Sequence, residues 1–518
     1  MSPFIAALLR PSAFPHPVSN LSLVETHISW VLLTGDYAYK VKKPVNLGFL
    51  DFSTLERRHF FCAEELRLNR RLAPELYLDV VPVTGSADAP RIAGTGTAIE
   101  YAVRMRQFEE AARLDRVLAR GALDCALVDK LARRIAGFHA ALPPAAPAAT
   151  FGSAENIGFY ARQNFDQIRP RLAQTSDLDL LARLEAWSSR EFVALGEAFA
   201  ARRRGGFVRE CHGDLHLANI ALIAGEPVVF DCIDFNPELR WIDVASEVAF
   251  VVMDLEDRGR PDLGNRFLNA YLENCGDYPG LAVLRFYRVY RALVRAKVAA
   301  FRLGQPELPE RERAGAATEC GEYLRLALRF TQPPRPWLAI TRGVSGSGKT
   351  TLTLPAVEAL GAIRIRSDVE RKRLFGLAAE ARSGSALDQG LYGRAAGERT
   401  YARLEELAES ALRAGFGVIA DATFLEQPRR QAFRELAARC GVPFAILDFH
   451  APDDLLQGRV AAREKAATDA SEAGVAVLRR QRQSMEALTA EEQALAIAID
   501  SGRPDAAALV IAGLKAVC

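Results

Sequence analysis

The sequence predicts a two-domain protein, in which an α+β domain is followed by an α/β domain whose parallel sheet carries helices on both faces. Three observations lead to this fold class. The chain has 518 residues, which exceeds what a single hydrophobic core usually serves. Residues 331–336 (TQPPRP) are rich in proline, as expected of a linker. Strands and helices alternate regularly after this linker but not before it, so we expect domains at 1–330 and 337–518.

The composition is that of an ordinary globular protein. Hydrophobic residues make up 49% of the chain and charged residues 25%. The net charge of +2 gives no overall field that would favour nucleic acid or a membrane surface. The eight cysteines are scattered without metal-type spacing, which suits a reducing cytoplasm. We find no signal peptide and no apolar run of about 18 residues, and therefore expect a cytoplasmic protein without a membrane span.

The N-terminal domain begins with a predicted β-hairpin. Residues 28–34 and 37–42 have strand-like sequences, and Gly35 with the following aspartate is a turn signal between them. Lys40 and Lys42 lie two positions apart, so they share one face of the second strand. The next predicted elements are a helix over 52–72, which carries Glu64 and Glu65, and strands over 76–84 and 98–105.

Helical patterns dominate the rest of the N-terminal domain. Helical stretches are predicted over 114–142, over 156–201 with a break at Pro170, and over 244–328, which includes an arginine-rich helix at 281–303. Between the last two stretches lies a short apolar strand, predicted over 227–231.

The C-terminal domain shows a repeated alternation of strand and helix. Predicted strands cover 337–341, 362–366, 417–420, 444–449 and 494–499, and the helices between them include 392–414 and 427–440. Such alternation is typical of a parallel sheet that is covered by helices on both faces.

A glycine-rich stretch, residues 343–350 (GVSGSGKT), follows the first of these strands directly. It matches G-x-x-x-x-G-K-[ST] at every position and lies between a strand and a helix, the context of a phosphate-binding P-loop. Such a loop turns backbone N–H groups toward one cavity, and the helix N-terminus adds partial positive charge. We expect it to bind ATP, with Lys349 on the β- and γ-phosphates and Thr350 on Mg²⁺. The residues expected to contact the nucleotide are Gly343, Val344, Ser345, Gly346, Ser347, Gly348, Lys349, Thr350 and Thr351.

Two carboxylates follow other strands of this domain. Asp368 comes just after the second strand, where the carboxyl ends of parallel strands line a ligand crevice. We expect it to orient or deprotonate an acceptor hydroxyl, with Arg371 one turn further along the same helix face. Asp421 follows the third strand and suits Mg²⁺, held through water. The alternative for both carboxylates is a role as helix caps.

A pair of arginines lies further along the chain. Arg459 and Arg463 are four positions apart on a predicted helix, so both can project to one side. Paired arginines suit a lid that neutralises charge during phosphoryl transfer, and the small, polar residues 466–474 after them suit a mobile lid. The alternative is a plain exposed helix face.

The N-terminal domain carries a second pattern related to phosphate chemistry, in residues 211–219 (CHGDLHLAN). Asp214 and Asn219 are five positions apart, as in kinase catalytic loops, where the aspartate orients the attacking hydroxyl and the asparagine holds a metal ion. The apolar strand that follows ends in Asp231, a further candidate metal ligand, with Asp234 as a close competitor. The alternative for the first two residues is loop capping.

Upstream residues can complete this second site. Lys40 or Lys42 of the hairpin is a candidate for the lysine that pairs with phosphate, and Glu64 or Glu65 could form its ion pair. The alternative for the lysines is a solvated hairpin face. His212 is expected to support the loop structurally instead of carrying a proton.

Residues 212–219 with Asp231 and Asp243 resemble the aminoglycoside phosphotransferase-like branch of the protein-kinase-like fold, roughly over 22–330. The resemblance implies that fold, with Asp214 orienting an acceptor and Asn219 and Asp231 on metal; the family spacing favours Asp231 over Asp234. One departure is the absence of a G-x-G-x-x-G loop between the presumed first strands, which leaves room for an inactive or altered kinase.

The C-terminal motifs resemble P-loop kinases such as polynucleotide 5′-kinases, gluconate kinases and zeta-toxin-like kinases, roughly over 335–518. The order of the two halves is also similar to bacterial fused proteins described as bifunctional phosphotransferase/ATP-binding proteins. These resemblances imply an ATP- and Mg²⁺-dependent phosphotransferase that acts on a hydroxyl group of a small molecule. Two alternatives stay open: a kinase for nucleic-acid 5′ ends, disfavoured because stacking aromatics are sparse, and a nucleotide-binding regulatory protein with an inactive N-terminal site.

Overall fold

The computed structural model describes the chain except residues 1, 47, 49, 306, 307, 333, 380, 382–392, 467–473 and 518 and the side chains of 463, 465 and 466. By the density of its contacts the chain forms two compact units. Unit 1 consists of Met1–Lys130, Phe138–Ile157 and Ala201–Val251, and unit 2 of Leu131–Gly137, Gly158–Ala200 and Val252–Cys518. This division follows contacts, whereas the expected domains at 1–330 and 337–518 follow sequence patterns and stay a prediction.

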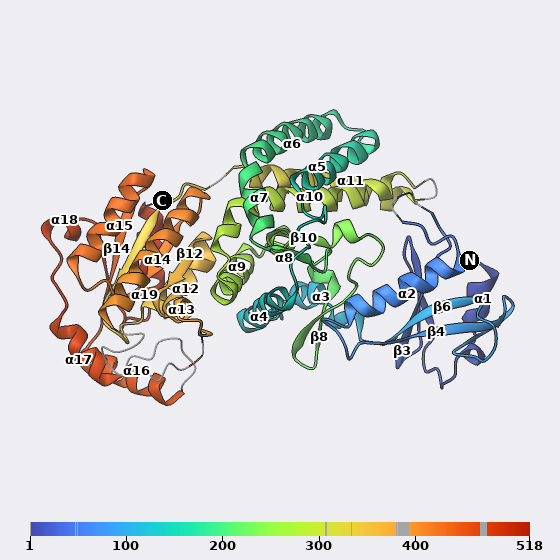
Figure 1. Ribbon diagram of the computed structural model, residues 1–518, viewed down its shortest axis with the longest axis horizontal. Coiled ribbons are helices and arrows are strands. Elements are labelled where there is room, and N and C mark those ends of the chain that lie inside the picture. Colours follow the sequence, from blue (N-terminus) through green and yellow to red (C-terminus); the bar gives the residue numbers. More distant parts are fainter. Residues whose placement is uncertain are drawn as a thin grey trace. The chain divides into compact units, whose positions relative to one another are not determined.

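Unit 1 is built on a six-stranded antiparallel sheet in the order β1-β2-β3-β6-β4-β5, with helix α2 (Leu55–Asn69) packed against it (Figure 1). The predicted hairpin, helix and following strands are confirmed. Two short strands were missed, because one is largely exposed and the other contains Pro90. The strands are β1 (Ser22–Glu25), β2 (Ser29–Leu33), β3 (Tyr37–Lys42), β4 (Tyr77–Ser86), β5 (Ala89–Ile92) and β6 (Glu100–Arg106).

Two small antiparallel pairs complete the strands of unit 1, β7 (Val208–Glu210) with β10 (Trp241–Asp243) and β8 (Ile220–Ile223) with β9 (Glu226–Val229). The predicted strand over 227–231 is one of these, but it ends before Asp231, whose backbone has a left-handed φ of 64°. Helices α1 (Pro3–Leu8) and α3 (Leu114–Ala119) lie in unit 1, whereas α4 (Cys125–Ala141) and α8 (Val244–Asp257) each contribute residues to both units. The single helical stretch predicted over 114–142 is therefore two helices.

The first part of unit 2 is helical. Helices α10 (Leu281–Leu303) and α11 (Glu310–Phe330) pack against each other, and α10 matches the predicted arginine-rich helix. The predicted break at Pro170 is confirmed, since a short 3-10 turn separates two helices there. Among the described residues, none of the helices combines the length and apolar character needed to cross a bilayer. Helices α6 (Thr175–Ala194) and α9 (Pro261–Cys275) also lie in unit 2, whereas α5 (Ala154–Ile168) and α7 (Gly196–Arg204) lie mostly in unit 2 and each has one end in unit 1.

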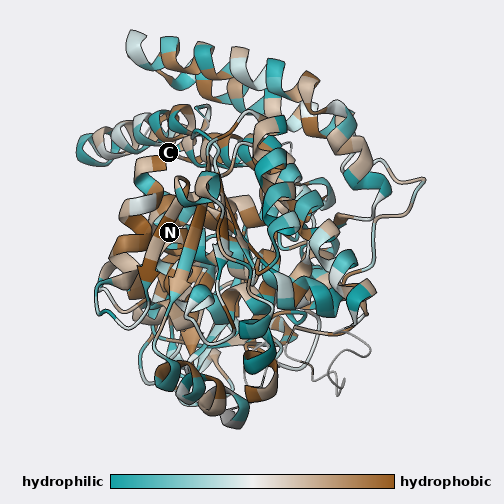
Figure 2. Cartoon of the chain, turned by 90° about the vertical axis from the view of Figure 1, so that its left-hand side faces the viewer, coloured by the Kyte–Doolittle hydropathy of each residue, from teal (hydrophilic) through white to brown (hydrophobic). Residues whose placement is uncertain are grey.

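The second part of unit 2 contains a five-stranded parallel sheet in the order β12-β13-β11-β14-β15. All five predicted strands are confirmed to within a residue or two. They are β11 (Leu338–Arg342), β12 (Ile363–Arg366), β13 (Val418–Asp421), β14 (Phe444–His450) and β15 (Ala496–Asp500). Figure 2 shows largely hydrophobic strands with helices around them, which is the burial expected for this architecture.

The helices of the sheet body follow the strands in alternation. Predicted helices over 392–414 and 427–440 correspond to α14 (Arg394–Arg413) and α15 (Gln427–Cys440). The core between sheet and helices is formed by residues such as Ala339, Ile419, Leu447, Val510 and Leu514. The helices are α12 (Lys349–Leu360), α13 (Ser367–Leu374), α14 (Arg394–Arg413), α15 (Gln427–Cys440), α16 (Asp453–Ala466), α17 (Val475–Gln483), α18 (Ala490–Gln493) and α19 (Ala506–Val517).

Candidate active sites

The glycine-rich stretch lies between β11 and α12, as the motif requires. Gly343, Gly346 and Gly348 all have positive φ, of 147°, 83° and 86°. A Cβ atom on Gly346 would lie 2.9 Å from Cγ2 of Val460, so a larger residue would not fit there. Helix α12 begins at Lys349, directly after the loop, so the loop lies at a helix N-terminus, the usual position of an anion site. The Lys349 ammonium lies along the loop and donates to the carbonyls of residues 343 and 344, both at 2.9 Å.

The two residues expected to hold Mg²⁺ in this site are in contact. Thr350 Oγ1 donates a hydrogen bond to Asp421 Oδ2 at 2.7 Å, and Asp421 is 5% exposed. Thr341, on the neighbouring strand, donates to the carbonyl of residue 422 at 2.7 Å and so steadies the segment after β13. A hydroxyl beside a carboxylate is an oxygen-donor set of the kind that Mg²⁺ prefers, so these residues fit the ion.

The candidate acceptor-orienting residue lies at the same edge of the sheet. Asp368 is in the first turn of α13, directly after β12, and Arg371 Nη1 lies 3.6 Å from its Oδ1. In the parallel register Arg366 pairs with Asp421, and β13 separates β12 from β11. The carboxyl ends of three adjacent strands therefore present Asp368, Asp421 and the P-loop on one side.

Arg459 of α16 also reaches the P-loop. Its guanidinium donates to Ser501 Oγ at 2.8 Å, to the Ser501 carbonyl at 2.9 Å and to the Gly346 carbonyl at 3.4 Å. The side chain of Arg463 and most of the expected lid, residues 467–473, lie outside the described residues, so the arginine pair stays a prediction. Sequence reasoning missed Gln481 of α17, whose Oε1 accepts the Ser345 amide at 2.7 Å; nothing in its helical surroundings signals this contact.

The second site is built on β3, α2 and the loop after β9. Lys40 and Lys42 both contact Glu65, at 2.8 Å to Oε1 and Oε2 respectively. Burial disfavours the charged form of Glu65, but the two lysines more than offset it and lower its pKa to about 2. Of the two glutamates considered, Glu65 makes the ion pair with the lysines, whereas Glu64 pairs with Arg67.

Each lysine of this site also contacts one of the two competing aspartates. Lys40 lies 2.6 Å from Asp231 Oδ1, and Lys42 pairs with Asp234. The side chain of Asp231 is 48% exposed, whereas those of Lys42 and Asp234 are 1% and 7% exposed. Burial raises the pKa of Asp234 in spite of its lysine partner. The Lys40–Asp231 pair is thus the one that solvent can reach.

The two candidate catalytic-loop residues, Asp214 and Asn219, lie in contact. Asn219 Nδ2 donates to the carbonyl and to Oδ2 of Asp214, both at 3.0 Å. His212 Nε2 lies 2.8 Å from the Phe230 carbonyl, and its Nδ1 accepts the Asp214 amide at 3.3 Å, which assigns the hydrogen to Nε2. Burial lowers the pKa of His212. These contacts support the structural role expected of this histidine.

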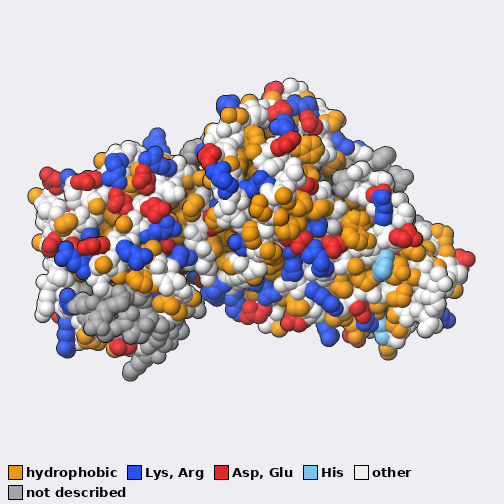
Figure 3. All heavy atoms as spheres, viewed as in Figure 1, with side chains coloured by type: hydrophobic (Ala, Val, Ile, Leu, Met, Phe, Trp, Pro, Cys, Tyr) orange, Lys and Arg blue, Asp and Glu red, His pale blue; other side chains and the backbone are white. Residues whose placement is uncertain are grey.

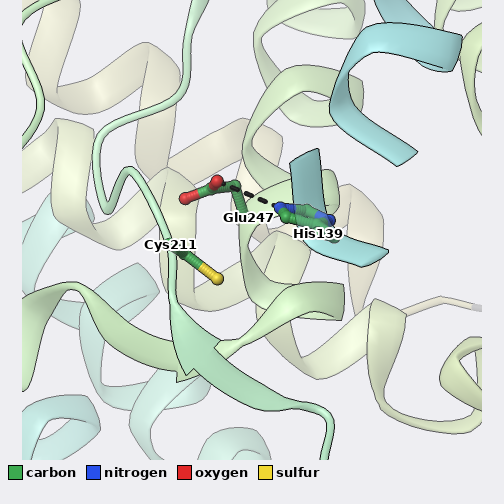
Figure 4. A group of neighbouring side chains, drawn as sticks. All are labelled: His139, Cys211 and Glu247. Atoms are coloured by element: carbon green, nitrogen blue, oxygen red, sulfur yellow. Dashed lines mark hydrogen bonds and ion pairs between the residues drawn. The ribbon is translucent and has the colours of Figure 1, made fainter. Parts of the chain in front are cut away.

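Three buried side chains, His139, Cys211 and Glu247, lie with one ligand atom of each within 4.8 Å of the others (Figure 4). Both oxygens of Glu247 accept hydrogen bonds, from His139 Nε2 at 3.1 Å and from the amides of His212 at 3.1 Å and Gly213 at 2.7 Å. The Cys211 thiol donates to the Ile242 carbonyl at 3.6 Å. The cluster therefore anchors the backbone just before Asp214, a role that sequence reasoning missed.

We expect this anchor to make the stability of unit 1 sensitive to acid. His139 and the backbone amides hold the pKa of Glu247 at about 2, against an ordinary value of 4.5, although burial opposes this. A lowered carboxyl pKa stabilises the fold above pH ~4.5, and this contribution, about 3 kcal/mol, is lost as the pH falls toward 2. In urea unfolding, the free energy of unfolding should fall less between pH 7 and pH 3 for Glu247→Gln than for wild type. Glu226→Gln, a change at an exposed glutamate, is the matched control, and equal pH profiles for all three proteins would contradict the anchor.

Asp243, the third aspartate of the pattern, is buried and forms an ion pair with an arginine of the same unit. Its two oxygens accept hydrogen bonds from Arg202 at 2.7 and 2.6 Å, and Oδ1 also accepts the Ala245 amide at the start of α8. Asp231 is held from another side, because its amide donates to the Tyr77 hydroxyl at 3.1 Å. Tyr77 is a further residue that the motifs did not indicate.

The chain combines two features of phosphotransferases: candidate kinase-type residues on and beside an antiparallel sheet, and a P-loop in a parallel sheet. The model of the phosphotransferase enzyme family matches residues 52–287, and that of the AAA domain matches residues 338–488. Uncharacterized proteins of Mycobacterium tuberculosis and Mycobacterium bovis are 34% identical over 462 residues, which cover 88% of this chain and 89% of each relative. The chain belongs to the same family as these mycobacterial proteins.

Each of the solved structures with detectable likeness covers only part of this chain. A sugar kinase from Janibacter sp. HTCC2649 is 21% identical, with 35% of this chain and 94% of that chain covered and a TM-score of 0.28. A choline/ethanolamine kinase family protein from Mesorhizobium loti is 12% identical over 64% of this chain and 99% of that chain, with a TM-score of 0.38. The amicoumacin kinase hAmiN is 12% identical over 62% and 91%, with a TM-score of 0.39.

Proposed function

We propose that this protein is an ATP- and Mg²⁺-dependent kinase that moves the γ-phosphate of ATP to a hydroxyl group of a small molecule, in the cytoplasm. The observation that carries the proposal is the contact of Thr350 with Asp421 at the mouth of the P-loop, with Asp368 after the adjacent strand. Asp368 offers a carboxylate that can orient or deprotonate the hydroxyl of an acceptor.

Each residue of the P-loop site has a role in this reaction. Lys349 and the amides at the start of α12 would bind the β- and γ-phosphates, and Thr350 and Asp421 would hold Mg²⁺, directly or through water. The ion, when bound, neutralises charge that develops on the phosphate oxygens. Arg371 and Arg459, with Arg463 as a further candidate, would neutralise charge from the acceptor and lid sides.

In the N-terminal site Asp214 would orient a second hydroxyl, with Asn219 and Asp231 on metal. We favour Lys40 over Lys42 for the phosphate contact. Lys40 and its partner Asp231 are partly exposed to solvent, whereas Lys42 and its partner Asp234 are buried. In kinases a glycine-rich loop between the first strands covers the phosphates of the nucleotide. The turn between β1 and β2, which takes this place here, is not glycine-rich. Its amide groups are used internally, since Thr26 bonds with Ser29 through both backbone and side chain.

The rival activity on nucleic-acid 5′ ends predicts a basic channel near Asp368. The basic residues there have internal partners instead. Arg364 and Arg366 contact Glu273, Lys372 donates to the Ala379 carbonyl at 2.9 Å, and Arg373 donates to the Glu273 carbonyl. On the face seen in Figure 3, basic and acidic side chains are interspersed. These contacts favour a small-molecule acceptor.

The test is ATP consumption with Mg²⁺ across sugars, sugar acids, aminoglycosides and 5′-hydroxyl oligonucleotides, for wild type, Lys349→Ala and Asp214→Ala. We expect at least one small molecule to stimulate turnover, and loss of that stimulation in one variant assigns the acceptor to that site. Stimulation by oligonucleotides alone would favour the nucleic-acid alternative. ATP binding without stimulation by any acceptor would contradict the kinase and support a regulatory protein.

A further inference from the structure

Helix α9 and strand β12 meet within unit 2, although they come from different sequence families. Helix α9 lies in the segment matched to the phosphotransferase enzyme family, and β12 in the segment matched to the AAA domain. Both elements belong to unit 2, where α9 lies against α12 and β12 (Figure 1). The residues of α9 that make these contacts are Asn265, Arg266, Asn269 and Glu273.

Asn269 covers the open edge of the parallel sheet. Strand β12 is one of the two edge strands, so among the described residues no other strand pairs with one side of its backbone. Asn269, which is 4% exposed, donates from Nδ2 to the Ala362 carbonyl at 2.9 Å and accepts the Arg364 amide on Oδ1 at 2.8 Å. The side-chain amide thereby replaces a neighbouring strand for two buried backbone groups, which are costly to leave unpaired.

Glu273, one turn further along α9, holds two arginines of the same strand. Arg364 Nη2 lies 2.9 Å from Glu273 Oε1, and Arg366 Nη1 lies 3.4 Å from Oε2. The side chains are largely buried, with 6% of Arg364 and 16% of Glu273 exposed. Burial opposes ionisation of Glu273, yet the two guanidinium groups hold its pKa below the ordinary value. One carboxylate is therefore the shared counter-ion of two buried cations.

The contacts of Glu273 continue to the residues of the P-loop site. Arg364 Nη1 donates to the backbone carbonyl of Thr350 at 2.7 Å, and the Thr350 hydroxyl contacts Asp421. On the other side, Arg373 of α13 donates to the Glu273 carbonyl at 2.6 Å. Helix α13 also carries Asp368 and its neighbour Arg371. The last turn of α9 is thus linked through Arg364 to Thr350, the threonine proposed to bind Mg²⁺. It is linked through Arg373 to α13, the helix that carries Asp368.

We propose that Glu273 is a positioning residue for the P-loop site and acts through Arg364 on Thr350. The inference rests on the proposed function of that site as an ATP·Mg²⁺ site. Mg²⁺ requires nearly ideal octahedral geometry, so a shift of the threonine is felt in binding of the ion. A residue outside the P-loop segment, in the part matched to the phosphotransferase enzyme family, therefore sets the nucleotide and Mg²⁺ affinity of the AAA-type site.

The test compares Glu273→Gln, Arg364→Gln and the double variant in the full-length protein. The readouts are the Kd for ATP at the site that Lys349→Ala removes, and the Mg²⁺ concentration that gives half-maximal ATP binding. Changes to groups that support metal ligands typically lower metal affinity by about 10–100-fold, so we expect about tenfold higher values for both readouts. If Glu273 acts through Arg364, the double variant should be no weaker than the single variants. Glu405→Gln breaks an exposed ion pair with Arg439 in the same unit and should leave both readouts unchanged.

Several outcomes would overturn the inference. One is a folded Glu273→Gln protein whose ATP affinity and Mg²⁺ requirement stay within about twofold of wild type. If Glu273→Gln does not fold, the double variant is used for the same measurements, because it has no uncompensated charge at position 364. Wild-type ATP affinity and Mg²⁺ requirement in the double variant would also contradict the inference. Additive effects of the two changes would exclude the route through Arg364. Wild-type protein without any Lys349-dependent ATP binding would overturn the proposed function itself and, with it, this inference.

Discussion

Replacement of Lys349 by alanine is expected to lower acceptor-stimulated ATP turnover at the P-loop site by about 10²–10³-fold, the usual effect of losing one group that stabilises transition-state charge. The Lys349 ammonium lies along the loop, at 2.9 Å from the carbonyls of residues 343 and 344, where it can reach the phosphates of a nucleotide. The measurement is the rate of ADP formation at saturating Mg²⁺ with the acceptor that stimulates wild type most strongly.

The matched control for this prediction is Lys515→Ala, which removes an exposed lysine of α19 in the same unit. It should keep the wild-type rate. The account of the P-loop site would be wrong if Lys349→Ala kept more than about a tenth of the wild-type rate with every acceptor that stimulates turnover.

Asp214→Asn should lower turnover at the N-terminal site by about 10²–10⁴-fold, the range for loss of a general base. Asparagine has nearly the same shape and keeps an oxygen that can accept the 3.0 Å hydrogen bond from Asn219, so the loop should stay folded. The measurement is acceptor-stimulated ATP turnover in the Lys349→Ala background, where only the N-terminal site contributes.

Asp88→Asn, a change in the exposed turn between β4 and β5, is the control for the N-terminal site and should have no effect. Turnover that is absent from the Lys349→Ala background, even with Asp214 intact, would mean that the N-terminal fold is inactive. That result would support its role as a regulatory domain, consistent with the internally bonded turn at Thr26 in place of a glycine-rich loop.

Much of the fold could be predicted because its signals are local. Most strands of the parallel sheet are short, largely apolar runs, and all five predicted strands are confirmed. The P-loop, Asp368 and Asp421 lie at or just after the ends of these strands. Prediction of the strands therefore also predicted where these residues lie in the sheet. The break within the helical stretch over 114–142 was missed, because the left-handed Gly121 interrupts it without a proline.

The partners of the site residues could not be predicted, because they lie far away in the sequence. Glu247 anchors the backbone before Asp214, and Tyr77 binds the amide of Asp231. Neither residue belongs to a motif, and both contacts depend on how separate elements pack. The same holds for Glu273 and Arg364, which come from segments of two different families. Long-range contacts of this kind exist only once the tertiary structure has formed.

The central claim is that one chain holds two separate phosphoryl-transfer sites, and the number of bound nucleotides tests it most directly. Isothermal titration with a non-hydrolysable ATP analogue and Mg²⁺ should give two sites per wild-type chain. It should give one site in Lys349→Ala and one in a variant with Lys40→Ala and Asp231→Asn. A single site in wild type that disappears in Lys349→Ala, or two sites that survive both sets of substitutions, would contradict the account.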